Sequence, residues 1–168
     1  MKKLLLILLT LSFALPVCAQ KLSKEERAAQ AKAANAVAVE SVNARAFVIV
    51  PSSYTESDGM IADNIDNANF ISCEGANLFA QGMICCGNKY TNITEITEYS
   101  VNIDKKGNLK LRIVVSGRML KGTYNITMRS NGNIADVIFM PQGGTTRKFT
   151  GPVVPLKGAS YNKRSNPM

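Results

Sequence analysis

Apolar and polar side chains alternate along most of the second half of this 168-residue chain. Four segments show the pattern most clearly, namely residues 96–103, 109–115, 124–128 and 134–140. Successive side chains of a β-strand point to opposite faces of a sheet, so a repeat of two is typical of a strand that is buried on one face only. Each of the four segments is therefore predicted to be such a strand.

Short turns separate the predicted strands. Residues 104–107 and 143–144 form two of them, and Asn131-Gly132 is the strongest hairpin signal, because both central positions of a two-residue hairpin turn need a positive φ. Connections this short join antiparallel neighbours, since a parallel crossover needs many more residues. A meander with one apolar face must curl or double over to bury that face.

The first half of the chain contains a predicted helix and shorter strands. The helix is predicted over residues 23–45, because Ser23 and Glu26 have the spacing of a capping box and alanines follow at helical intervals. Its small side chains fit close packing on a sheet, or its first turns remain loose in solution. Residues 52–66 are polar and are predicted to be a loop. Further strands are predicted at 46–50, 69–73, 78–84, 146–149 and 153–156, with a turn at 74–77.

These elements define the expected fold. It is α+β and mainly β, with the N-terminal helix packed on an antiparallel meander of about eight strands that forms a curled sheet, a sandwich or a barrel. The sequence contains no internal repeat and no linker, and a chain of this length suits one domain. The expected organisation is a signal peptide at residues 1–19, a single domain at 20–156 and a flexible basic tail at 157–168.

The first nineteen residues have the pattern of an export signal. Two lysines precede an apolar run over residues 4–13, and Pro16 comes before a small-residue cleavage site that ends at Ala19. The run is too short and too early for a membrane span. Cys18 raises the alternative of an acylated lipoprotein, but such a signal needs a small residue before the cysteine, where Val17 stands. A periplasmic or secreted protein, cleaved near Ala19, is therefore favoured.

Charge and composition exclude some partners. Cleavage removes two of the 20 Lys and Arg residues and none of the 12 acidic ones, so the mature net charge is +6. The basic residues are scattered, and the chain has no tryptophan. Nucleic-acid binding is not expected, since it usually combines a basic face with stacking aromatic residues. No later segment is apolar for long enough to span a bilayer, so no transmembrane segment is expected in the mature chain.

The adjacent Cys85 and Cys86, in GMICCGN, are the residues that most invite a chemical role. The chain has no histidine, so a Cys–His nucleophile is excluded, and Lys89 is the nearby group that would lower a thiol pKa. Structural zinc takes four ligands, whereas Cys73, Cys85 and Cys86 supply three, and adjacent cysteines lack the usual spacing of a zinc site. Neither a reactive thiol nor a zinc site is therefore favoured.

A disulfide is the common state of cysteines in an oxidising compartment. If the turn centres between Gly75 and Ala76, Cys73 lies opposite Leu78, and Cys85 lies about 23 Å further along its strand, too far for a bond. A bond between adjacent cysteines would close a strained ring. Three reduced, partly buried cysteines acting as small apolar residues are therefore predicted, and an odd thiol leaves intermolecular pairing open.

Other polar groups carry weaker signals. Asp58, Asp63 and Asp66 lack the alternate spacing of a calcium loop, so a solvated loop is the simpler interpretation. Asn92 and Asn125 each begin an Asn-Ile-Thr glycosylation pattern, and both are interpreted as strand residues. No catalytic, cofactor-binding or metal-binding residue is assigned, and no cofactor is expected.

The layout of the chain resembles that of a known family. The predicted helix runs into RAFVIVP, followed by NFISCEGANLFAQG, YSVNIDKKGNLKLRIVVSG, YNITMRSNGNIADVIFM and FTGPVVPL. This order resembles the secreted or periplasmic Bacteroidetes family known as domain of unknown function 4251, with Asn69-Phe70, Gly75 and Gln81 in matching positions. The family's glycine-rich stretch is replaced here by GMICCGNKYTNIT. The resemblance implies an exported α+β protein, dominated by antiparallel strands, with no assigned activity.

The predicted fold and the candidate residues are compatible with two functions. The favoured one is an exported, non-enzymatic envelope protein whose curled sheet binds a small apolar ligand or another envelope component, because no acid, base and nucleophile converge in the pattern. The alternative is an envelope enzyme that uses the Cys85 or Cys86 thiol, or the carboxylates of the loop at residues 52–66.

Overall fold

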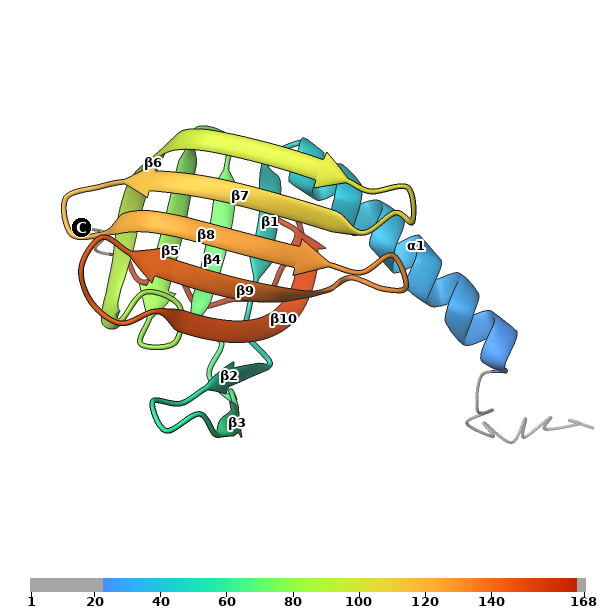
Figure 1. Cartoon of the computed structure of the whole chain (residues 1–168), viewed down its shortest axis with the longest axis horizontal. Coiled ribbons are helices and arrows are strands. Elements are labelled where there is room, and N and C mark those ends of the chain that lie inside the picture. The colour runs from blue at the N-terminus through green and yellow to red at the C-terminus, as the bar shows by residue number, and fades with distance from the viewer. Residues whose placement is uncertain (1–22, 166–168) are drawn as a thin grey trace, which may run out of the picture.

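The computed structural model describes residues 23–165, so the predicted signal peptide and Cys18 lie outside the described residues. The described chain forms one helix and ten strands (Figure 1). Their bounds are α1 Lys24–Asn43, β1 Ala46–Ile49, β2 Ser53–Thr55, β3 Ile61–Asp63, β4 Phe70–Glu74, β5 Asn77–Gly82, β6 Asn88–Ile103, β7 Leu109–Ser116, β8 Lys121–Met128, β9 Ile134–Pro141 and β10 Arg147–Pro155. Among these residues, no helix is long and apolar enough to cross a membrane.

Eight of the strands form a closed barrel. They follow the order β1-β4-β5-β6-β7-β8-β9-β10, and each neighbouring pair is antiparallel. The barrel closes where β1 pairs with β10, with Phe47 opposite Pro155 and Ile49 opposite Val153. The predicted mainly β meander with an N-terminal helix is therefore confirmed, and of the three shapes expected for the sheet the protein adopts the barrel.

Apolar side chains from all eight strands fill the barrel. Alternation places these residues inside, as in β7, where Leu109, Leu111, Ile113 and Val115 are buried and the residues between them are exposed or half-buried. The rings of Tyr124 and Phe139, on adjacent strands, stack with their centroids 4.2 Å apart. The interior is therefore a packed core, as expected for a barrel of this strand number.

The two ends of the barrel are closed by different segments. Figure 1 shows α1 beside the end that carries the β6–β7 and β8–β9 turns. There Ala38 and Val42 of α1 belong to the core, and Tyr99 donates a hydrogen bond of 2.5 Å to the carbonyl of Val42. Asn35 donates to the carbonyls of Arg129 and Gly132 in the β8–β9 turn. The opposite end is closed by residues 83–87, whose Cys85 also belongs to the core.

The local signals at α1 are confirmed. Ser23 is the N-cap, with its hydroxyl accepting from the amide of Glu26 at 3.1 Å and its own amide donating to the Glu26 carboxylate at 2.7 Å. These reciprocal bonds satisfy two amides that the first turn leaves without helical partners. They also lower the pKa of the Glu26 carboxyl. At the other end Arg45 adopts a positive φ of 52°, which turns the chain into β1.

Three predictions about the strands are wrong. Residues 52–66, predicted to be a loop, contain the hairpin of β2 and β3, because β2 pairs with β10 at Phe149 and Thr150. Strand β6 begins at Asn88 instead of residue 96. Segments 146–149 and 153–156 belong to one continuous strand, β10, in which Gly151 lets the Val50 carbonyl come closer than a side chain would permit. The barrel has the eight strands that were expected, and the hairpin of β2 and β3 adds two more.

The hairpin at Asn131-Gly132 forms, but not with the predicted turn. The last ladder pair before the turn joins Met128 to Ala135, so the connection is longer than two residues. Among the described residues other than glycine only Arg45 has a positive φ, and Gly132 is not among the glycines that have one. The bonds from Asn35 to the carbonyls of this turn show that α1 helps to hold the longer loop.

Candidate functional site

Cys85 and Cys86 lie at the end of the barrel opposite α1. Cys85 is fully buried, and Tyr124 donates a hydrogen bond of 3.2 Å to its carbonyl. The Cys86 thiol donates to the carbonyl of Gly82 at 3.2 Å and accepts from the Asn92 side chain at 3.4 Å. Both thiols are free, as is the buried thiol of Cys73. The pair is therefore part of the plug, the segment of residues 83–87 that closes this end of the core.

Burial raises the pKa of all three thiols. The pKa of Cys86 rises to about 11 and that of Cys73 to about 12, and that of Cys85 lies well above its ordinary value. The guanidinium of Arg147 opposes the shift at Cys85 and Cys86 but does not overcome it. Thiols with such pKa values are protonated at neutral pH, and the thiolate is the nucleophilic form.

The cation beside the thiols is not the one that the sequence indicated. Lys89 is exposed on β6, whereas Arg147 from β10 donates to the carbonyl of Met83 at 2.7 Å. Arg147 is 62 positions from Cys85 in the sequence, so only the pairing of distant strands brings them together. The predicted register of Cys73 opposite Leu78 is confirmed, but Cys85 follows the end of β5 instead of continuing that strand.

The candidate polar groups have structural partners. Asp58 and Asp66 accept hydrogen bonds from the amides of Met60 and Ala68, which shapes the ends of the β2–β3 hairpin. Asn92 is buried and donates to the carbonyl of Ala80 at 3.0 Å. Within residues 23–165, no group of three or more Cys, Asp and Glu side chains is placed to hold a metal ion.

Asn125 and Asn92 fit the strand interpretation of the two glycosylation patterns. Asn125 lies in β8 opposite Arg112 of β7 and Ile138 of β9, and its side chain is half-buried. Asn92 lies in β6 opposite Ala80, on the face that points into the barrel. Both asparagines are therefore central strand residues and not loop residues.

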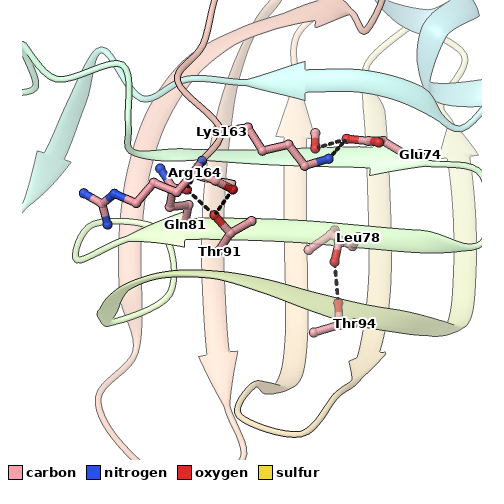
Figure 2. A network of polar contacts seen from close by, with 8 residues as sticks. Glu74, Leu78, Gln81, Thr91, Thr94, Lys163 and Arg164 are labelled. Carbon is pink, nitrogen blue, oxygen red and sulfur yellow. Dashed lines mark hydrogen bonds and ion pairs between the residues drawn. The ribbon is translucent and has the colours of Figure 1, made fainter. Parts of the chain in front are cut away.

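The C-terminal segment packs on the outside of β4, β5 and β6. Gln81, fully buried on β5, donates to the carbonyls of Ala68 and Asn162 at 2.7 and 2.8 Å. The carbonyl of its side chain accepts from the hydroxyl of Thr91 and from the amide of Arg164 (Figure 2). One buried amide side chain thus connects the loop before β4, strand β6 and the C-terminal segment.

Two further contacts hold this segment. The ring of Tyr161 lies 4.6 Å from that of Phe70, centroid to centroid. The Lys163 ammonium pairs with the Glu74 carboxylate at 2.8 Å and lies 3.3 Å from the centroid of the Phe79 ring. Residues 157–165, expected from the sequence to form part of a flexible tail, therefore make specific contacts with the barrel in this structure.

The hairpin of β2 and β3 projects below the barrel in Figure 1. It exposes Met60 by 66% and Ile61 by 77%, and Ile65, two residues after β3, is fully exposed. Beside it a surface cavity of about 420 Å³ is lined by residues of the hairpin, of the segment before Cys85 and of the start of β10. The sequence contained a signal for this surface, because Met60-Ile61-Ala62 is an apolar run inside a polar segment.

Comparison with known proteins supports the fold. The structure is similar to a crystal structure of a DUF4251 family protein from Bacteroides eggerthii DSM 20697, with a TM-score of 0.67 and 20% sequence identity, over 79% of this chain and 99% of that chain. No family model matches the sequence, and no curated protein does. The structural similarity confirms the resemblance to DUF4251 at the level of the fold. It gives no information about an activity of this chain.

The raised thiol pKa values predict slow thiol chemistry in the folded protein. At pH 8 about one thiol in ten is ionised at an ordinary pKa near 9, against about one in a thousand for Cys86. In the chain that begins at Gln20, we expect Ellman's reagent to label the native thiols at least about a hundredfold more slowly than free cysteine. All three should react promptly in urea. A native thiol that reacts as fast as free cysteine would contradict this account.

Gln81 is expected to control the C-terminal segment. Gln81→Ala leaves the Asn162 carbonyl and the Arg164 amide without their buried partner, so the free energy of unfolding should fall by about 1–3 kcal/mol. Trypsin should then cleave faster after Lys163 and Arg164. The control is Gln142→Ala, which alters an exposed glutamine side chain. Urea unfolding and mass spectrometry of the digest measure both effects, and an unchanged Gln81→Ala protein would refute the role.

Proposed function

We propose that the chain is an exported cell-envelope protein that acts as a non-enzymatic interaction module, and that it contacts its partner through the β2–β3 hairpin. Export is supported by the charged start, apolar run and small-residue site of residues 1–19. The observation that carries the interaction role is the exposure of Met60 and Ile61 on one projecting hairpin and of Ile65 two residues after it.

The filled barrel favours an outer contact over an enclosed ligand. Phe47, Tyr124, Met128 and Phe139 are almost completely buried in the core, in the space that a ligand would need. Apolar ligand sites are cavities of several hundred Å³, and a tightly packed interior leaves no such volume. Binding of a small apolar ligand inside the sheet therefore has less support than contact with another envelope component.

The enzyme alternative has less support for a similar reason. Burial holds the thiols of Cys85 and Cys86 in the protonated form at neutral pH. The carboxylates of Asp58 and Asp66 accept backbone hydrogen bonds within their own loop. A thiol nucleophile needs an accessible thiolate, which Cys85 and Cys86 do not offer, while Asp58 and Asp66 are exposed and act as acceptors that shape their own loop.

The proposal is tested with the labelled mature protein and an envelope fraction of the organism that encodes it. The double variant Ile61→Ser/Ile65→Ser removes two exposed isoleucines of the hairpin, and we expect binding to weaken about tenfold or more. The matched control, Ile134→Ser/Ile138→Ser, removes two exposed isoleucines from β9 on the barrel wall and should change affinity by less than about twofold.

Two results would contradict the proposal. One is the absence of saturable binding by the wild-type protein, and the other is an equal loss of binding in both double variants. Export is tested by mass spectrometry of the envelope fraction. The mass of the protein recovered from it should correspond to a chain that begins at Gln20. A mass that includes an acyl group on Cys18 would identify a lipoprotein instead.

A further inference from the structure

We propose that β3 accepts an extended, positively charged segment of another protein as an added β-strand. The proposal rests on the assignment of the β2–β3 hairpin as the contact surface, and it specifies the chemistry of the partner. Three features of the hairpin carry it: an open strand edge, exposed apolar side chains and a local excess of negative charge.

The open edge follows from the topology. Each of the eight barrel strands has a neighbour on both sides, whereas β3 stands at the end of the sheet and pairs only with β2 among the described residues. The backbone amide of Asn64 donates to the carbonyl of Ser52, and the backbone amide of Glu56 donates to the carbonyl of Met60. The backbone groups of Met60 and Asn64 therefore face β2. Alternation along an antiparallel ladder then points the amides and carbonyls of Ile61 and Asp63 away from β2. Such an edge is a template for a further strand.

The exposed apolar side chains lie on and beside this edge. Ile61 belongs to β3 itself, Met60 precedes it, and Ile65 follows two residues after the strand. Exposed edge strands are usually protected by charges or by a covering segment, because an apolar edge invites pairing. Here Ile61 stands on the free strand and Met60 and Ile65 flank it, which provides an anchor beside the free backbone groups.

The charge of the hairpin selects the partner. Residues 51–66 contain four acidic side chains, those of Glu56, Asp58, Asp63 and Asp66, and no basic one. Residues 51–66, the hairpin with its flanking residues, therefore carry a charge of −4 in a mature chain whose net charge is +6. Pairing of two copies edge to edge through β3 would bring two such hairpins together, and like charges oppose it. A basic segment of a different protein is the complementary occupant.

The strand also specifies the pattern of the incoming segment. Ile61 and Asp63 are two residues apart and so share one face, while Ala62 lies opposite Tyr54 on the other. An antiparallel strand would place an apolar side chain opposite Ile61 and a Lys or Arg opposite Asp63, at alternate positions. The residues between them would be small or polar, because they lie on the side of Tyr54 and the barrel.

The test uses a peptide of this pattern, Thr-Val-Thr-Lys-Thr-Val-Thr-Lys, with blocked ends and a fluorescent label. Fluorescence anisotropy at low salt should show saturable binding to the mature protein. The same peptide with glutamate in place of lysine should bind at least about tenfold more weakly. Asp63→Lys and Ile61→Ser should each weaken binding of the lysine peptide by a similar factor, whereas Ile138→Ser, on a strand with two neighbours, should not.

Two N-methylated peptides distinguish strand addition from a general electrostatic contact. Methylation at the valines and lysines removes the amides that would face β3, so binding should be lost. Methylation at the threonines removes the amides on the far edge, so binding should persist. Equal effects of the two isomers would overturn the proposal. Matching thermal unfolding of each protein variant and the wild type excludes loss of the fold as the cause.

The remaining outcomes separate this proposal from the function on which it rests. If the lysine peptide does not bind but the hairpin variants still lose envelope binding, strand addition is wrong and the contact surface stands. If both fail, the hairpin is not the contact surface. If the protein alone dimerises in sedimentation and Ile61→Ser abolishes the dimer, the occupant of β3 is a second copy and the basic segment is wrong.

Discussion

The pairing of β1 with β10 is the contact on which the rest of the structure depends. It joins strands that are about a hundred residues apart in the chain and converts a meander into a closed barrel. Closure gives every barrel strand two neighbours, so the backbone groups of these strands are used within the molecule. It also fixes a narrow interior, which the apolar side chains of the core occupy. What the barrel offers to a partner is therefore its outer surface and the one hairpin that lies outside the ring.

Closure of the barrel also explains why Cys85 and Cys86 are buried. A filled barrel needs both ends covered, and here α1 covers one end and residues 83–87 cover the other. Cys85 and Cys86 are small enough to fit this second plug, where Tyr124, Asn92 and the carbonyl of Gly82 provide their polar contacts. The burial that makes them useful there raises their pKa values and removes them as nucleophiles at neutral pH. Burial of Cys85 and Cys86 thus helps to close the core and at the same time lowers the reactivity of their thiols.

The features that sequence reasoning predicted correctly are local. The capping box of Ser23 and Glu26 and the alternation in β7, β8 and β9 each depend on residues close together in the chain. The missed features depend on distant partners. The first half of β6 does not alternate in hydropathy, because Thr91 and Thr94 are buried polar residues whose hydroxyls find acceptors on β5.

The same reason explains what was missed around the candidate sites. Arg147 approaches the thiols only because β10 lies beside the turn after β5, and Lys89, the nearer residue in sequence, faces solvent. The contacts of the C-terminal segment require Gln81, a polar residue whose burial no hydropathy pattern indicates. The choice among a curled sheet, a sandwich and a barrel also required the β1–β10 register, since all three bury the same apolar face.

The barrel is closed by the pairing of β1 with β10, and β3 is the strand with a free edge among the described residues. Residue-by-residue amide hydrogen exchange, followed by NMR on the mature protein, tests this arrangement directly. We expect the amides of β1 and β10 that face each other to exchange only through global unfolding, and those of Ile61 and Asp63 to exchange nearly as fast as in an unfolded peptide. Fast exchange along the β1–β10 seam, or strong protection of Ile61 and Asp63 in the protein alone, would contradict it.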